Sequence, residues 1–204
     1  MVVWGKSGAA RKGRAPGIAS YQAYEGRKAT NAARDSVDLA RKNAHFDQRA
    51  WLNVSYGNYR YTIGQPFSTV LQVLDTGRTP ARNVKGTVVV HLLKVGEKPA
   101  FTYDHGESVE TGTMFPNVSQ AVISWLIPTS IPWGQPVKPM LITGPIFQDL
   151  KSGKSYILVY GKLTYDSAFG ANHFFQFCAT SGAVQFAEPK ECIEYNDVDN
   201  NEEP

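Results

Sequence analysis

Residues 67–94, FSTVLQVLDTGRTPARNVKGTVVVHLLK, establish the fold class of this chain. They contain two runs rich in β-branched residues, 67–75 and 83–94, a composition that is typical of β-strands. Residues 75–80 lie between the runs and form a turn signal, because glycine can adopt positive φ and proline cannot donate to a sheet ladder. The stretch therefore predicts two strands that are joined by a turn.

The same pattern continues through the chain beyond Ala50, where the hydrophobic period changes to two. Because seven or eight short strands occur without βαβ alternation, we expect an all-β fold, an antiparallel immunoglobulin-like β-sandwich preceded by an N-terminal helix. The prolines between 128 and 145 predict a long crossing or an edge. Further strands are predicted near 51–56, 119–127, 138–142, 155–165 and 173–178, with a shorter one near 183–186.

The first fifty residues have a different composition. Residues 1–20 are rich in glycine and basic residues and predict a flexible basic arm. Residues 21–49 predict a polar helix or stalk, in which small residues recur at helical spacing from Ala33 to Ala44. A β-sandwich domain at 50–187 and an acidic C-terminal tail at 188–204 complete the predicted organisation.

Charge is divided unevenly along the chain. Residues 1–50 contain 10 basic and 4 acidic residues, a net charge of +6, whereas the remaining residues contain 11 basic and 14 acidic residues, a net charge of −3. The functional interpretation is attraction to phosphate, on an anionic membrane surface or on nucleic acid, and the simpler alternative is a solvated face. The candidate contact residues in the predicted helix are Arg27, Lys28, Arg34, Arg41 and Lys42.

The sequence contains no recognisable catalytic, cofactor or metal motif. The histidines at 45, 91, 105 and 173 do not have the spacing of metal ligands, and His173 is expected at the rim of a strand. Neither a Gly-x-Ser-x-Gly motif nor a phosphate-binding loop is present. A hydrolase or carbohydrate site near Asp104, His105 and Asp166 is a minor alternative to a solvated polar loop. We therefore predict no enzyme activity, no cofactor and no small-molecule substrate.

The two cysteines, Cys178 and Cys192, lie at the junction between the last long strand and the acidic tail. Their even number and placement favour a disulfide, which would stabilise the fold by roughly 3 kcal/mol in the chain-entropy model. A disulfide requires an oxidising compartment. The alternative is a pair of reduced cysteines, one buried and one loosely held.

Four short motifs carry a resemblance: DQRAWL at 47–52, TGRTPARNV at 76–84, FQFC at 175–178 and CIEYN at 192–196. Together they resemble a family of uncharacterised bacterial envelope proteins over about residues 29–200. Members have one membrane helix, a polar helical stalk and an extracytoplasmic β-sandwich closed by a Cys-containing C-terminus. The resemblance implies a location at the periplasmic face of the inner membrane, and Trp51 would cap the core where the stalk meets the first strand.

This chain departs from that family at residues 1–20, which are not apolar, and no stretch reaches the roughly 18 apolar residues of a membrane helix. Without an upstream anchor, a cytoplasmic location would follow.

We expect a non-enzymatic interaction or structural domain at the cell envelope, or an accessory subunit of a membrane complex. Trp125 and Trp133, together with Tyr103 and Phe115, are candidate contact residues, because aromatic side chains give large contact areas. Core packing is the alternative for each of them. A second hypothesis is a nucleic-acid-associated protein that binds through basic residues 1–50, although few aromatic residues are interleaved there.

Overall fold

The computed structural model describes residues 16–57, 61–128, 136–170, 172–181 and 189–198. The chain divides into two compact units, 1–44 and 45–204. The described part of the first unit is α-helical and belongs to α1 (Pro16–Gln48), whose last turn belongs to the second unit. The second unit contains the described strands and a short helix, α2 (Gly144–Lys151).

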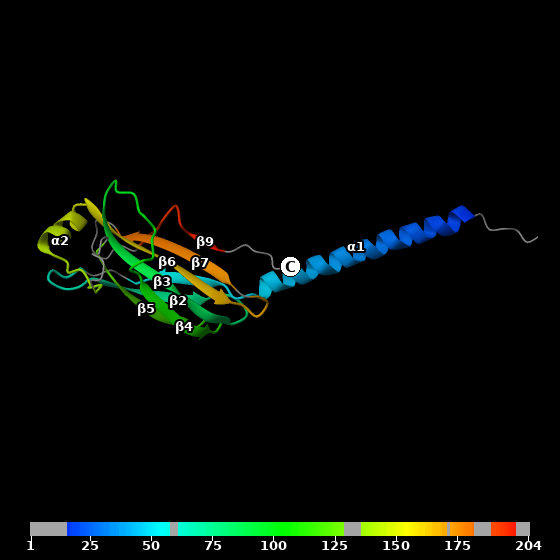
Figure 1. Ribbon diagram of the computed structural model, residues 1–204, viewed down its shortest axis with the longest axis horizontal. Coiled ribbons are helices and arrows are strands. Elements are labelled where there is room, and N and C mark those ends of the chain that lie inside the picture. The colour runs from blue at the N-terminus through cyan, green and yellow to red at the C-terminus, as the bar shows by residue number, and fades with distance from the viewer. Residues whose placement is uncertain (1–15, 58–60, 129–135, 171, 182–188, 199–204) are drawn as a thin grey trace, which may run out of the picture. The chain divides into compact units, whose positions relative to one another are not determined.

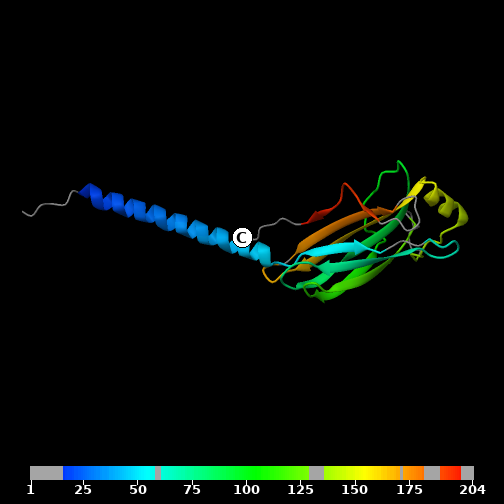
Figure 2. The ribbon, with the colours of Figure 1, turned by 180° about the vertical axis from the view of Figure 1, so that it is seen from behind.

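Two antiparallel β-sheets form the second unit (Figures 1 and 2). Every pairing between their strands is antiparallel, which confirms the predicted all-β class. The smaller sheet has the order β1 (Leu52–Tyr56), β2 (Ser68–Asp75), β5 (Ser119–Trp125). The larger has the order β4 (Glu107–Met114), β3 (Ala81–Lys94), β6 (Ser155–Asp166), β7 (His173–Ser181), β8 (Lys190–Glu191), and β9 (Asp197–Val198) also pairs with β7.

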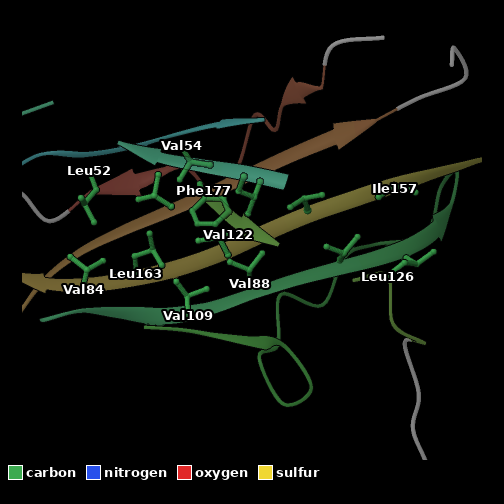
Figure 3. Close-up of a cluster of buried hydrophobic side chains, with 14 of the residues drawn as sticks. Leu52, Val54, Val84, Val88, Val109, Val122, Leu126, Ile157, Leu163 and Phe177 are labelled. Atoms are coloured by element: carbon green, nitrogen blue, oxygen red, sulfur yellow. The ribbon is translucent and has the colours of Figure 1, made fainter. Parts of the chain in front are cut away.

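The two sheets pack face to face around one hydrophobic core. The smaller sheet contributes residues such as Leu52 and Leu71, and the larger sheet contributes residues such as Val88 and Phe177, all of them buried. Figure 3 shows side chains from both sheets gathered between the strands. In β2 the fully buried positions recur at every second residue, as expected for a strand with one face toward the core.

The central strands of the larger sheet are buried on both faces. Val88 and Val90 point into the core between the sheets, whereas Val89 and Leu93 belong to a second hydrophobic cluster. Because successive side chains of a strand point to opposite faces, this second cluster lies on the outer face of the sheet. Burial on both faces explains the uninterrupted apolar run at 88–90, which alternation alone would not produce.

The chain enters the sandwich through a network centred on the buried side chain of Asp75. One oxygen, Oδ1, accepts hydrogen bonds from the amides of Trp51 at 3.2 Å and Gly77 at 2.9 Å. The other, Oδ2, accepts from the amide of Ala81 at 3.2 Å. Asp75 ends β2, Trp51 precedes β1 and Ala81 begins β3. The carboxyl group therefore connects the end of β2 with the starts of β1 and β3, across both sheets.

Backbone contacts complete this network. The amides of Thr76 and Arg78 donate to the carbonyls of Trp51 at 2.7 Å and Arg49 at 3.3 Å. A β-carbon on Gly77 would lie 2.3 Å from the Arg49 carbonyl oxygen, so the turn needs glycine for this close approach. Trp51 is half-buried rather than a cap of the core, and its ring lies 3.8 Å from the Arg49 guanidinium, an arrangement that favours cation–π attraction.

Some predicted elements are wrong in position or type. Residues 107–114 form β4, whereas the sequence predicts a polar loop around Glu107 and Glu110. The strand was missed because only two of its residues, Val109 and Met114, are buried and apolar. Residues 138–142 do not form a strand, and Leu141 makes only an isolated bridge to Pro66. Instead α2 follows, begun by a Thr143 side chain that caps the helix, with a proline in its first turn. The predicted strand at 183–186 lies outside the described residues.

Both ends of the chain contain more regular structure than the composition predicts. Helix α1 begins at Pro16, inside the arm that was expected to be flexible at 1–20, and proline is favourable at a helix start because its missing amide is unpaired there anyway. In the predicted acidic tail at 188–204, β8 and β9 both pair with β7. The described part of this segment is therefore paired with the larger sheet, while its charged side chains remain exposed to solvent.

The predicted disulfide is present and holds this C-terminal segment on the sheet. Cys178 and Cys192 are joined with their Cα atoms 5.3 Å apart, and the amide of Cys192 donates to the carbonyl of Cys178. The side chain of Asn196 accepts from the amide of Cys178 at 2.8 Å and donates to the carbonyl of Cys192 at 2.7 Å. The ring of Tyr195 stacks on Phe101 with centroids 4.1 Å apart. These contacts cover the outer cluster.

Replacing Asp75 with alanine is expected to lower the free energy of unfolding by about 3 kcal/mol or more, since leaving a buried donor without an acceptor costs about 1–3 kcal/mol. Urea unfolding followed by tryptophan fluorescence measures the change. Asp104→Ala, at an exposed aspartate, is the control and should change stability by less than about 0.5 kcal/mol. Equal stability of the two variants would contradict the role of Asp75.

Reduction of the disulfide under native conditions is expected to lower stability by about 3 kcal/mol and to expose the C-terminal segment to limited proteolysis. The double variant Cys178→Ala, Cys192→Ala is the control, because its urea midpoint should not respond to reductant. An unchanged midpoint and proteolysis pattern in the reduced wild type would show that the disulfide does not hold the segment.

Candidate interaction surfaces

The outer face of the smaller sheet carries no charged residue. Strand register places Val70 opposite Ile123 and Ser68 opposite Trp125, and directly opposed residues share a face of the sheet. We call this surface, formed by the outward positions of β1, β2 and β5, the uncharged face. Its members are Asn53, Ser55, Ser68, Val70, Gln72, Leu74, Ser119, Ala121, Ile123 and Trp125.

Three large apolar side chains on the uncharged face are accessible to solvent. The exposed fractions are 40% for Val70, 54% for Ile123 and 38% for Trp125. They sit together on two adjacent strands, so they form a patch rather than scattered single residues. A patch of this composition favours contact with an apolar surface, because its burial would release water without leaving a charge unpaired.

The uncharged face ends at β5, an edge strand whose continuation at Leu126 and Ile127 bonds to Val90 of the larger sheet. The order of the smaller sheet places β5 at one end, and within the described residues β5 forms a ladder only with β2. Edge strands present backbone donors and acceptors that can pair with a strand of another chain. Trp125 and Ile123 therefore lie beside backbone groups that could add to a contact.

The five predicted basic contact residues all lie in α1 and are exposed. At 100° per residue, the three arginines align at spacings of seven and the two lysines lie beside them, within an arc of about 140°. Asp35 and Asp38 fall on the same side of the helix. Helix α1 as a whole has five basic and four acidic residues, a net charge of +1. The electrostatic field of the helix is therefore weak. Four further basic residues of the chain lie at 1–15, outside the described residues.

The remaining predicted contact aromatics are in different environments. Phe115 is 59% exposed, in the turn before β5. Tyr103 is instead packed against the outer cluster, with its ring 5.9 Å from that of Tyr160. Trp133 lies outside the described residues. Of the two predicted tryptophan contact residues, only Trp125 can therefore be placed, and it lies on the uncharged face.

The three residues of the minor alternative, a hydrolase or carbohydrate site near Asp104, His105 and Asp166, do not come together in the structure. Asp104 lies near Tyr160, which pairs with Val89, whereas Asp166 pairs with Arg82. Seven residues along β3 separate these two positions, roughly 23 Å at strand spacing. Asp104 and His105 therefore lie far from Asp166. In the described part of the chain, no group of three or more His, Cys, Asp or Glu side chains is arranged to hold a metal ion.

Two histidines are packed into the sandwich. His173 is buried rather than at a rim, because its Nε2 lies 3.0 Å from the Ser167 hydroxyl and its ring packs on Tyr165. His91 lies in the larger sheet with its ring edge-on to Tyr160. Burial and, to a smaller extent, the nearby His105 lower the pKa of His91 below its ordinary value.

Sequence reasoning missed Val70 and Ile123. The signal was available in the alternation of 68–75 and 119–125, where every outward position is uncharged. It could be read only after the two strands were known to be neighbours, because the patch exists only when both are placed side by side.

The disulfide is evidence on the location of the protein, since it suggests an oxidising or extracytoplasmic compartment. Among the residues that the structure describes, no helix has both the length and the apolar composition needed to cross a membrane.

No protein-family model matches the chain, and neither a curated protein nor a solved structure is significantly similar to it.

Stability should fall on acidification from about pH 7 to pH 5 because of His91. With its folded-state pKa lowered below about 6.5, the unfolded state binds the proton more readily, so stability rises with pH through this window. His91→Gln should flatten the pH dependence of the thermal midpoint. His45→Gln is the control for a histidine outside this cluster. Identical slopes for wild type and His91→Gln would contradict the assignment.

Proposed function

We propose that this chain is a non-enzymatic, immunoglobulin-like interaction domain of the bacterial cell envelope, an accessory subunit that docks onto a protein partner through the uncharged face. The observation that carries the proposal is the adjacency of Val70, Ile123 and Trp125 on a sheet face without a single charged residue. Aromatic residues that bury well at the centre of a contact contribute most of the binding energy at protein interfaces.

The chemistry of this face favours a protein over a nucleic acid. Binding to phosphate backbones depends on lysine and arginine side chains that displace counterions, and the uncharged face has none. Helix α1, with its net charge of +1, would give only weak attraction to phosphate. An anionic membrane surface is the other contact open to the exposed cations of α1, and the same net charge of +1 makes that attraction weak as well.

The immunoglobulin-like assignment is supported by strand order. The order β1-β2-β5 opposite β4-β3-β6-β7 corresponds to strands A, B and E facing strands C, F and G, with the fourth strand beside the third. Core packing between two antiparallel sheets is the architecture expected of such domains.

The envelope assignment rests on two independent features. The disulfide requires an oxidising compartment. The motifs at 47–52 and 76–84, which carry the resemblance to envelope proteins, contain most of the residues of the Asp75 network. The shared motifs thus coincide with the network that joins the first residues of the sandwich to both sheets.

The proposal is tested by complex formation in fractionated native cells. Wild-type protein is expected in a membrane-associated complex, measured by native gel and size-exclusion chromatography of a detergent extract. Val70→Glu and Ile123→Glu should weaken the association at least about tenfold, because each variant would bury an unpaired charge.

Val95→Glu is the matched control, since Val95 is 66% exposed and lies after β3 of the other sheet. Its complex should be unchanged. A wild-type chain that elutes free of any partner, or equal complexes in Val70→Glu and Val95→Glu, would contradict the proposal.

A further inference from the structure

A polar hollow of about 280 Å³ lies at one end of the larger sheet, and it is separate from the uncharged face. It forms where β3 bulges: β3 advances three residues between Arg82 and Lys85 while its partner β6 advances two between Asp166 and Thr164. Bulges redirect side chains out of the regular ladder and are common beside binding sites. The polar residues that line the hollow are Asn83, Lys85, Glu110, Thr164, Asp166 and Asn172.

Asp166 organises the hollow. Its Oδ2 accepts from the Nδ2 of Asn83 at 2.7 Å, and its Oδ1 accepts from the amide of Asn172 at 3.1 Å. The hydrogen bond from Asn83, followed by that from Asn172, lowers the pKa of Asp166, so the carboxylate is ionised at neutral pH. A carboxylate accepts about four hydrogen bonds, so Asp166 retains capacity for a ligand.

The backbone around the hollow is held in unusual conformations. Asn83 and Asn172 have φ values of 52° and 66°, and Gly112 has a φ of 74°. Left-handed conformations cost free energy for residues with a side chain, and they concentrate where a fold fixes a ligand contact. Here they place the side-chain amide of Asn83 and the backbone amide of Asn172 on the two oxygens of one carboxylate.

The lining combines hydrogen-bond donors and acceptors with little net charge. The two side-chain amides can each donate and accept, and the Lys85 ammonium donates. The Thr164 hydroxyl donates to the Lys85 carbonyl at 3.3 Å and can accept, as can the carboxylates of Glu110 and Asp166. Closely spaced hydroxyl groups, which both donate and accept, match this mixture.

We propose that this hollow is a binding site for a neutral saccharide, with Asp166 and Asn83 as the principal hydrogen-bonding residues. The site is on the opposite sheet from the uncharged face and does not depend on the proposed protein partner. It shares Asp166 with the minor alternative near Asp104, His105 and Asp166, but Asp104 and His105 lie far from the hollow.

The test is saturation-transfer difference NMR on the full chain with three probes: cellobiose, maltose and N,N′-diacetylchitobiose. At least one is expected to bind with a dissociation constant near or below about 1 mM, as suits a shallow polar site. Asn83→Gly removes the amide but tolerates the left-handed φ, and it should weaken binding at least about tenfold.

Asn117→Gly is the matched control, because Asn117 also has a positive φ, 61°, and is outside the hollow. It should bind as the wild type does. Asp166→Asn, which retains one acceptor oxygen, should give a partial loss, with folding checked by circular dichroism. Absence of saturation transfer from all three probes, or equal binding by Asn83→Gly and Asn117→Gly, would overturn the proposal.

Discussion

The carboxyl group of Asp75 is the constraint on which the rest of the sandwich depends. It accepts three backbone amides from Trp51, Gly77 and Ala81, which belong to the start of β1, the turn after β2 and the start of β3. These segments feed both sheets, so the position of each sheet relative to the other is fixed at this point. The side chain is completely buried, and water cannot replace it as an acceptor without opening the structure. The Tyr165 hydroxyl, which donates to the Ala50 carbonyl at 3.2 Å, ties the same segment to β6.

The two sheets differ in what covers their outer faces, and the proposed contact surface lies on the face that is left uncovered. The larger sheet is covered over its central strands by residues around Phe101 and by the disulfide-linked segment that contains Tyr195. The smaller sheet leaves Val70, Ile123 and Trp125 accessible. A chain that stabilises one outer face with its own segments but leaves the other uncharged has a surface suited to a partner. The polar hollow lies beyond the covered region of the larger sheet, so the two proposed sites do not compete.

Sequence reasoning captured the elements that alternation or long apolar runs determine. Strands β2, β3 and β6 were predicted within a few residues because their buried positions are strongly apolar. Strand β4 escaped because Gly112 and two glutamates interrupt its apolar pattern, and its burial comes from β3 rather than from its own composition. Asp75 looked like a solvated turn residue, since its partners are backbone amides that no sequence pattern reveals. The hollow was also invisible, because it depends on a register shift between β3 and β6.

The pairing of β3 with β6 also bears on how the chain reaches this structure. The paired residues run from Lys94 with Ser155 to Arg82 with Asp166, so each contact spans between 61 and 84 residues of chain. Closing loops of that length costs entropy before any contact forms, and β-rich domains dominated by such contacts fold in milliseconds to seconds. Before β6 pairs with it, strand β3, which is apolar on both faces, has one unpaired edge that other incompletely folded chains can bind. The rate at which β3 and β6 meet therefore sets how long a newly made chain remains open to aggregation.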